Sequence, residues 1–480
     1  MVGQPATTKP PRSQANRRLA HPRRFLIAII ILSVMLRVGV ALYLGDTVPP
    51  AKDEMSYSVL AERLATGHGY SFPSPWYPFA KADAPTSHWS FLYTGFVAGV
   101  YAVVGPHPLA ARLVQAVVAG VLMPWVTWRL ARRIRKEEGA PPVAAKKKED
   151  LVPLIAAGLS AVYAYFVLYG AMVQTEAFFI CALLWSLERG LAVADRMEAP
   201  FGCAPSGRSA QDASSGSAQG ALWTGVSFGL SLGVAALLRQ SILPWVAVMF
   251  LYLAIRWLMR RREGAKIVQL APLVVAGVVM VGCIAPFTIH NYIAYDNFLL
   301  LNSNAGYAMY AAQHPLHGTS FGEYRNMPLP EDIDPAMMNE ATWDKELMRR
   351  GIGFVLAEPG RYLMLSLSRV RDYIEFWPTP DSSALFNIGR VLSIGIFLPF
   401  MLYGLYLALL GRGRQIFDLQ SSIFLAVFMA FYSVLHIFTW AMSRYRLPVD
   451  AVAVVFAALA IADLAQRMCP GKVSAWLPRS

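Results

Sequence analysis

Ten stretches of about 20 mostly apolar residues recur along this chain, and they constrain its fold more than any other feature. They cover residues 25–44, 109–131, 151–171, 174–194, 219–237, 241–260, 266–288, 385–410, 419–441 and 446–467. Each is long enough to cross a bilayer as a helix. Only 15% of the 480 residues are charged, whereas soluble domains carry about 25%. The sequence therefore predicts an all-α polytopic membrane protein with about 10–11 transmembrane helices.

The stretch 88–104 is shorter, and its placement decides the topology of everything after it. It opens with His88-Trp-Ser-Phe-Leu-Tyr-Thr, a mixture of aromatic and polar residues that is typical of the membrane interface. If it crossed the membrane, every later basic loop would face outward. We therefore expect a helix that lies in the outer interface or re-enters there, with a crossing helix as the alternative.

Basic residues are concentrated on alternate loops. Of the 43 lysines and arginines, 26 lie before residue 25, in 129–150, 195–218, 256–266 and 411–418, or after 466. The positive-inside rule makes these segments cytoplasmic, together with the N-terminus. The net charge of +13 is then a topology signal, and we expect no nucleic-acid partner. The pattern predicts a multi-pass protein of the inner or plasma membrane.

The chain divides into five regions. A basic tail, 1–24, precedes a transmembrane module, 25–289, which includes the outer loop 45–108. A long outer loop, 290–384, is followed by the C-terminal transmembrane helices of 385–467 and a tail, 468–480. Helices are expected at 340–356 and 361–376 within the long loop, because Glu358-Pro-Gly360 separates them. The Gly-, Ser- and Ala-rich segment 195–218 is expected to be a flexible linker.

An acidic pair, Asp53-Glu54, follows the first span. Apolar side chains then recur with the spacing of an amphipathic helix lying on the membrane, at Tyr57, Leu60, Ala61 and Leu64. Asp53 shares an edge with Tyr57 and would face the bilayer boundary, where desolvation raises the pKa of a carboxyl. That would suit a general base. Alternatively, the two acids begin a helix whose macrodipole favours them.

Further charged residues are predicted on the same outer face. Glu176 lies at the outer end of the span 174–194, where an ionisable residue is a functional candidate or simply part of a helix start. Met442-Ser-Arg-Tyr-Arg-Leu-Pro448 joins the last two spans and carries two arginines against the positive-inside rule. Arginine forks bind phosphate oxygens, although snorkelling at the interface is the alternative for each arginine.

Acids and cations on one face favour a phosphate-bearing lipid substrate. The catalytic candidates are Asp53 and Glu54. The candidate substrate-binding residues are Tyr57, Lys81, Glu176, Arg239, His290, Arg444, Tyr445 and Arg446.

The order of these motifs resembles that of the C superfamily of membrane glycosyltransferases, which have the GT-C fold. The branch in question is that of the protein O-mannosyltransferases and the lipid A aminoarabinose transferases, glycosyltransferase family 39. The matching motifs, within residues 25–465, are Asp53-Glu54, Gly105-Pro-His-Pro-Leu-Ala-Ala-Arg112, Gln174-Thr-Glu176, Leu238-Arg239, Ala285-Pro-Phe-Thr-Ile-His-Asn291-Tyr, Asn304-Ala-Gly306-Tyr and Ser443-Arg-Tyr-Arg-Leu-Pro448. Pro85-Thr-Ser-His88 departs from the family's Pro-Pro pattern, so Lys81 and Asp83 are only approximate equivalents of its polar pair.

The resemblance implies an enzyme that moves a hexose or pentose, with inversion, from a polyprenyl-phosphate donor to a glycan, lipid or protein acceptor. Asp53 would be the base, and Arg444, Arg446 and Arg239 would hold the donor phosphate. Some relatives bind a divalent metal near the positions of Asp83, His88 and His290, but no spacing here demands one. We therefore expect no certain cofactor, with a divalent metal possible but not favoured.

A transporter or a flippase of lipid-linked sugars is the alternative function. It would predict an inverted repeat and broken helices at the membrane midplane, with ionisable residues deep inside the spans. No such repeat is visible in the sequence.

The predicted topology can be tested by cysteine labelling. Ser382→Cys and Ser215→Cys, each made in a chain whose four native cysteines are replaced by serine, should react from opposite sides of the membrane. The measurement is labelling of intact cells with a membrane-impermeant maleimide before and after permeabilisation. Labelling of both positions from the same side would contradict the topology.

Overall fold

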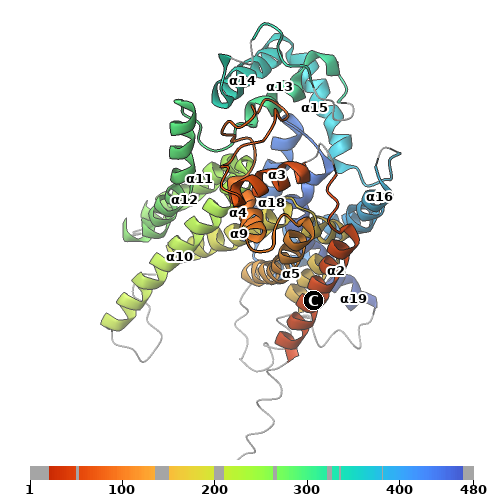
Figure 1. The fold of residues 1–480 in the computed structure, drawn as a ribbon. Coiled ribbons are helices and arrows are strands. Elements are labelled where there is room, and N and C mark those ends of the chain that lie inside the picture. The colour runs from red at the N-terminus through yellow and green to blue at the C-terminus, as the bar shows by residue number, and fades with distance from the viewer. Residues whose placement is uncertain are drawn as a thin grey trace, which may run out of the picture.

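The computed structural model describes residues 21–49, 53–135, 151–198, 210–262, 267–321, 327–333, 337–380 and 382–468 (Figure 1). Nine helical segments in these ranges are long and apolar enough to cross a membrane. They are α2 (His21–Leu44), α5 (Pro108–Arg133), α9 (Glu176–Glu198), α10 (Ala210–Leu238), α11 (Leu243–Arg262), α12 (Ala271–Tyr295), the continuous run of α16 (Ala384–Arg390), η5 (Val391–Gly395) and α17 (Ile396–Leu409), α18 (Leu419–Phe438) and α19 (Leu447–Met468). The predicted polytopic helical architecture is confirmed.

The remaining predicted span, 151–171, is not one straight helix. It consists of α7 (Leu151–Val162) and α8 (Ala164–Ala171), which meet at an angle of 53°. Backbone carbonyls freed by the break are satisfied by Arg37 of α2, which donates to the carbonyls of Ala161 and Ser160, both at 3.2 Å. Gly170 lets this arginine approach, because a Cβ there would lie 2.9 Å from Arg37 Cδ. The break is therefore closed by a buried side chain.

Two short helices lie between α2 and α5. They are α3 (Asp53–Ala65) and α4 (Phe91–Val104). The 14 residues of α4 span about 21 Å, less than the ~30 Å of a bilayer core. Whether 88–104 crosses or lies in the interface stays a prediction.

The apolar edge of α3 was expected to lie on the membrane, but it packs against other parts of the protein. Tyr57, Leu60 and Ala61 are buried in the same hydrophobic core as Tyr93 and Val97 of α4. Protein covers this edge, so the expected contact of that edge with the membrane is wrong. The same α3–α4 packing fixes where α3 begins, and hence where Asp53 lies.

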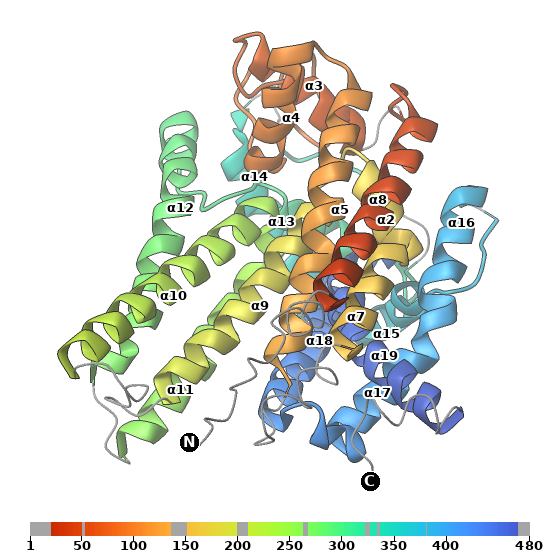
Figure 2. The ribbon, with the colours of Figure 1, turned by 90° about the horizontal axis from the view of Figure 1, so that it is seen from below.

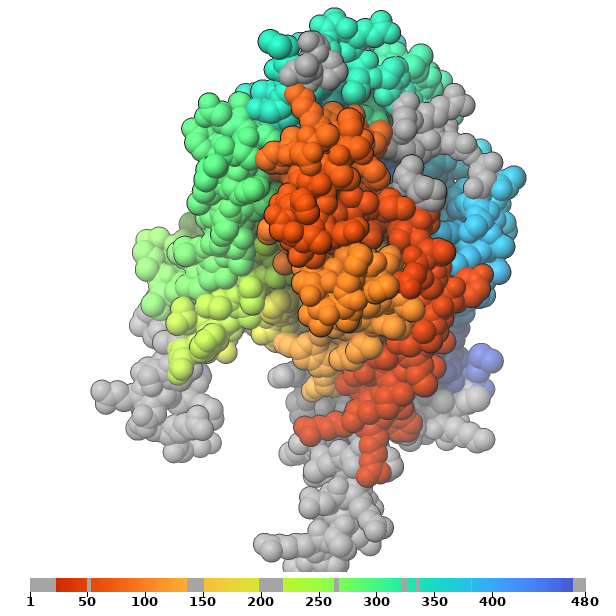
Figure 3. All heavy atoms as spheres, viewed as in Figure 1, coloured from red at the N-terminus to blue at the C-terminus, as the bar shows by residue number. Residues whose placement is uncertain are grey.

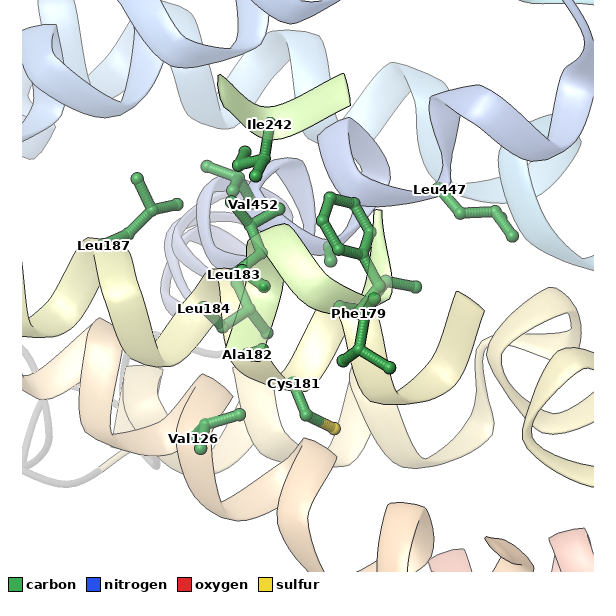
Figure 4. Packing of buried hydrophobic residues seen from close by; sticks show 14 of the residues in the cluster. Val126, Phe179, Cys181, Ala182, Leu183, Leu184, Leu187, Ile242, Leu447 and Val452 are labelled. Carbon is green, nitrogen blue, oxygen red and sulfur yellow. The ribbon is translucent and has the colours of Figure 1, made fainter. Parts of the chain in front are cut away.

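The centre of the bundle is formed by α9 and α19, the most buried of the described spans. Figure 4 shows Leu183, Leu184 and Leu187 of α9 packed among residues of neighbouring elements, including Val452 of α19 and Ile242. Ile242 belongs to η1 (Gln240–Ile242), a short turn between α10 and α11. Because these helices are close-packed, the residues at their ends have fixed positions relative to one another.

The long loop 290–384 folds into a helical cap. It contains α13 (Ala305–Gln313), α14 (Glu340–Ala357) and α15 (Pro359–Ile374), and the predicted helices with a break at Glu358 are confirmed. Gly306 and Gly351 bring α13 and α14 into backbone contact: a Cβ would lie 1.8 Å from the Asp344 carbonyl oxygen at the first and 2.7 Å from the Met309 carbonyl carbon at the second. Figures 1 and 3 show this cap beside residues 53–104.

One end of the bundle therefore carries both 45–108 and 290–384, and we call it the loop-bearing end. Figure 2, turned by 90°, shows α3 and α4 together beyond the end of α5. At the opposite end, part of the expected linker is helical, since residues 210–218 belong to α10, while residues 199–209 lie outside the described residues, as do most of the two tails. That the loop-bearing end is the outer face stays a prediction.

Candidate functional site

The turn between α18 and α19 aims an arginine at the first residue of α3. This turn is η7 (Ser443–Arg446), a 3-10 helix. Arg444 Nη1 lies 2.5 Å from Asp53 Oδ2, with the two side chains 19% and 31% exposed. The pair joins positions 391 residues apart in sequence and remains partly open to ligands. It brings together the predicted catalytic acid and a predicted phosphate-binding cation.

A second acid–arginine pair lies beside the first. Arg239, between α10 and η1, donates to the Glu176 carboxylate and, through Nε, to Thr175 Oγ1 at 3.0 Å. Arg444 Nη1 is 3.9 Å from Glu176 Oε1, so the two pairs are connected. We call Asp53, Glu176, Arg239 and Arg444 the charge quartet. Its two negative and two positive formal charges cancel.

Tyr445 lies between the two cations of the quartet. The guanidinium carbons of Arg239 and Arg444 are each 5.3 Å from the centroid of its ring, within the range of a cation–π interaction. The imidazole of His436 is stacked on the same ring, with centroids 5.0 Å apart. Tyr445 therefore orients both guanidinium groups.

The charge state of Asp53 is set by opposing effects. Burial opposes ionisation, but the neighbouring Arg444 outweighs it, followed by smaller contributions from Arg239 and His88, so the pKa of Asp53 is lowered. The expectation that Asp53 faces the bilayer boundary with a raised pKa is wrong, because the carboxylate faces a cation that the sequence did not pair with it. Asp53 is thus an anion held beside a partly exposed guanidinium group.

Glu54, although adjacent to Asp53, faces the other way. It is 2% exposed, pairs with Arg112 of α5 at 2.9 Å and accepts a hydrogen bond from the Val173 backbone N–H at 3.0 Å. Arg112 also donates to the Gly45 carbonyl at 2.6 Å. These contacts tie α3 to α5 and to the turn before α9, so Glu54 positions its neighbour.

Arg446 is similarly separated from Arg444. It pairs with Asp450 of α19 at 3.1 Å and donates to the Tyr373 carbonyl at the end of α15. Tyr163, at the break between α7 and α8, donates to the same Asp450 at 2.8 Å. Asp450 was missed from the sequence, although an acid four residues after an arginine, inside a span, is a recognisable signal.

The remaining predicted residues lie outside the charge quartet. Tyr57 is buried and packs edge-on against Tyr93, with ring centroids 4.8 Å apart. Lys81 is exposed on the loop after the Trp76 turn, and His290 is exposed on α12 beside Phe287. Burial raises the pKa of the Tyr57 hydroxyl, and the nearby Asp53, Arg239 and Glu176 also shift it, so Tyr57 lies next to the quartet. Lys81 and His290 do not take part in the two acid–arginine pairs.

No group of three or more His, Cys, Asp and Glu side chains suited to a metal occurs in the described part of the chain. Asp83, one of the approximate metal candidates, pairs with Arg63 at 2.5 Å. Whether a divalent metal binds stays a prediction.

A buried polar network connects the first loop with the cap. Glu340 of α14 accepts from the Ser87 backbone N–H and from Ser303 Oγ, both at 2.8 Å. Asn302 Nδ2 donates to the carbonyls of Ser87 at 3.1 Å and Trp89 at 2.6 Å. The network fixes residues 86–90 relative to the segment 302–304. Sequence reasoning did not identify it, because the segment 86–90 lies more than 200 residues before the segment 302–340 along the chain.

Comparison with known proteins supports the fold. Neither a family model nor a curated protein sequence matches the chain. Among solved structures, it is similar to the archaeal oligosaccharyltransferase AglB from Archaeoglobus fulgidus in complex with an inhibitory peptide and a dolichol-phosphate, with a TM-score of 0.55 and 14% identity over 96% of this chain and 52% of that one. A complex of the same enzyme with Zn and sulfate gives a TM-score of 0.51 and 14% identity over 94% of this chain and 50% of that one.

The likeness to AglB confirms the predicted all-α polytopic GT-C fold, and the chain spans about half the length of these structures. ArnT from Cupriavidus metallidurans bound to undecaprenyl phosphate is also similar, with 14% identity over 92% of this chain and 79% of that one. Its TM-score of 0.34 is too low to add to the fold assignment.

The different surroundings of the two adjacent acids predict different effects on stability. Glu54→Ala leaves the buried Arg112 charge unpaired and should cost about 3–5 kcal/mol of unfolding free energy. Asp53→Asn should cost about 1 kcal/mol or less, because Arg444 is partly exposed and remains near Glu176. The measurement is thermal unfolding of each variant in the same lipid nanodiscs. Equal losses in the two variants would contradict the division of roles.

Proposed function

We propose that this chain is an integral-membrane glycosyltransferase that moves a sugar from a polyprenyl-phosphate donor to an acceptor, with inversion at the anomeric carbon. The carrying observation is the ion pair between Asp53 and Arg444, which joins a base candidate to a phosphate-binding candidate at the loop-bearing end. The GT-C fold shared with AglB, an enzyme solved with dolichol-phosphate, supports the donor class. We further infer that the loop-bearing end is the outer face, from the positive-inside pattern.

Asp53 is the proposed general base. Its carboxylate takes the proton of the acceptor's nucleophilic group as that group attacks the anomeric carbon. The bond between the anomeric carbon and the donor phosphate oxygen breaks, and its electron pair leaves with the polyprenyl phosphate. The anomeric carbon thus exchanges its bond to the phosphate oxygen for a bond to the acceptor, and the acceptor's proton is transferred to Asp53. The partial exposure of this side chain supports access for an acceptor.

Arg444 and Arg239 are the proposed phosphate ligands. Because the charges of the quartet already cancel, we infer that a phosphate binds by replacing a carboxylate at one of the arginines. Arg444 is the natural choice, since its partner Asp53 is 31% exposed whereas Glu176 is 3% exposed. Donor binding would therefore move Arg444 onto the phosphate and release the Asp53 carboxylate, and the two arginines would then stabilise the leaving phosphate.

Arg446 receives a different role from the one its family resemblance implies. Its guanidinium is buried, with Nε paired with Asp450 and Nη1 donating to the Tyr373 carbonyl. We therefore assign it to positioning the η7 turn and assign phosphate contact to Arg444 and Arg239.

The break between α7 and α8 does not favour the transporter alternative. In transporters, broken helices expose backbone groups to a central substrate site. Here Arg37 occupies the freed carbonyls, and among the described helices this is the one bent pair that is apolar and long enough to be a membrane span. Apart from Arg37, the acids and cations considered above gather at one end of the bundle instead.

Donor binding tests the proposed exchange of partners. Arg444→Ala should weaken binding of undecaprenyl phosphate about tenfold or more, because a charge-assisted contact is lost. Asp53→Asn should bind the lipid at least as tightly as wild type, since Arg444 no longer has a competing carboxylate, while sugar transfer is lost. The measurements are microscale thermophoresis of nanodisc-embedded protein and transfer from undecaprenyl-phosphate-linked mannose, glucose, galactose and arabinose.

A matched control is Arg349→Ala, which removes an exposed arginine of the cap that pairs with Glu346. It should leave lipid binding and transfer unchanged. Unimpaired transfer in both Asp53→Asn and Arg444→Ala would refute the proposed function.

The same exchange predicts a pH dependence. In the free enzyme Arg444 holds the pKa of Asp53 below its usual value, so Asp53 protonates only as the pH falls through that lowered pKa. In the donor complex, Arg444 contacts the phosphate and the added anion raises the pKa of Asp53. The acid limb of kcat should therefore lie at a higher pH than the acid limb of kcat/KM for the donor. Superimposable limbs in steady-state pH profiles would argue against the exchange.

A further inference from the structure

His88 lies beside the charge quartet, at the position where the chain departs from the family's Pro-Pro pattern. It is partly exposed on the loop before α4. Its imidazole contacts two aromatic rings, Trp89 at 5.0 Å and Phe79 at 5.8 Å between centroids. Trp89 in turn packs edge-on against Tyr57 at 5.6 Å, one helical turn after Asp53. This chain of contacts brings His88 and Asp53 to the same region.

The tautomer of His88 follows from the contact between its imidazole ring and a backbone carbonyl. Nδ1 lies 3.3 Å from the carbonyl oxygen of Ser303. A carbonyl oxygen can only accept, so Nδ1 carries the hydrogen and Nε2 has a free lone pair. Burial lowers the pKa of His88 to about 4, so the ring is neutral at physiological pH. Across the described ranges, no protein group is hydrogen-bonded to Nε2.

The segment 302–304 holds both the imidazole and the backbone of His88. Asn304 Nδ2 donates to the His88 carbonyl at 3.3 Å, and Ser303 belongs to the same segment. Gln240, the residue after Arg239, donates to the Asn302 carbonyl at 3.0 Å. The segment 302–304 therefore connects the imidazole to the quartet, and His88 has a fixed position relative to the phosphate-binding arginines.

We propose that His88 Nε2 accepts a hydrogen bond from the acceptor substrate, beside the nucleophilic group that Asp53 deprotonates, and that the acceptor is a saccharide unit. A saccharide has a second hydroxyl group, which can donate a hydrogen bond to the His88 Nε2 lone pair while the first hydroxyl reacts. It also supplies apolar ring faces that suit the partly exposed aromatic ring of Phe79. This inference rests on the proposed function and deepens it by naming the acceptor class.

Two substitutions separate the two nitrogens of the ring. His88→Asn can keep a donor where Nδ1 meets Ser303 but places nothing at Nε2. His88→Gln reaches the position of Nε2 but loses the contact with Ser303. If Nε2 binds the acceptor, the Asn variant should raise the acceptor KM about tenfold, the usual effect of one lost hydrogen bond. The Gln variant should stay within about threefold of wild type.

The assay uses the full chain in nanodiscs, with the undecaprenyl-phosphate-linked sugars named above and two acceptor sets: methyl glycosides, and peptides containing serine and threonine. Wild type should transfer to a methyl glycoside. His88→Asn should leave the binding of undecaprenyl phosphate and the hydrolysis of donor by water unchanged, because neither needs the acceptor.

Three results would overturn the inference: transfer to the peptides alone, an unchanged acceptor KM in His88→Asn, or an equal loss of donor hydrolysis and transfer in that variant. Each leaves the proposed function standing if Arg444→Ala still weakens undecaprenyl phosphate binding. Failure of the proposed function would appear instead as unimpaired transfer in both Asp53→Asn and Arg444→Ala.

Discussion

The ion pair between Asp53 and Arg444 at the loop-bearing end depends on two buried ion pairs that hold its partners in place. Each partner has a nearby residue of the same charge that is buried and paired elsewhere: Glu54 for Asp53, and Arg446 for Arg444. Glu54 anchors α3 to Arg112, and Arg446 anchors η7 to Asp450. Breaking either buried pair would leave an uncompensated charge, so both anchors are strongly held. In each of the two motifs, one charged residue fixes the backbone and its neighbour is presented to the site.

The different roles of neighbouring charged residues explain which parts of the fold and site could be predicted from the sequence. The spans and the cap helices were predictable because long apolar runs and capping signals are local. The choice of Arg444 over Arg446 was not, because two arginines separated by one residue look equivalent until the 3-10 turn directs them to different partners. The break at Tyr163 was also hidden, since neither Pro nor Gly marks it and a distant arginine supplies its hydrogen bonds.

The prediction of a raised pKa for Asp53 was wrong because its ion-pair partner, Arg444, lies 391 residues away in the sequence. Helical periodicity correctly located its helix, but burial and an opposing cation shift a pKa in opposite directions, and only the fold reveals which effect prevails. The polar network around Glu340 has the same character. Ser87 and Ser303 appear in the sequence as ordinary turn residues, yet together they satisfy a buried carboxylate and hold the loop that carries His88.

The balanced charges of the quartet have a kinetic consequence. A cluster whose formal charges cancel exerts little attraction beyond the Debye length, which is about 8 Å at physiological ionic strength. It cannot draw an anionic headgroup from bulk solution by long-range steering in the way a basic cleft does. A lipid substrate needs no such field, because the bilayer confines it to two dimensions. Encounter would then be governed by lateral diffusion and by the membrane content of the lipid, with little sensitivity to salt.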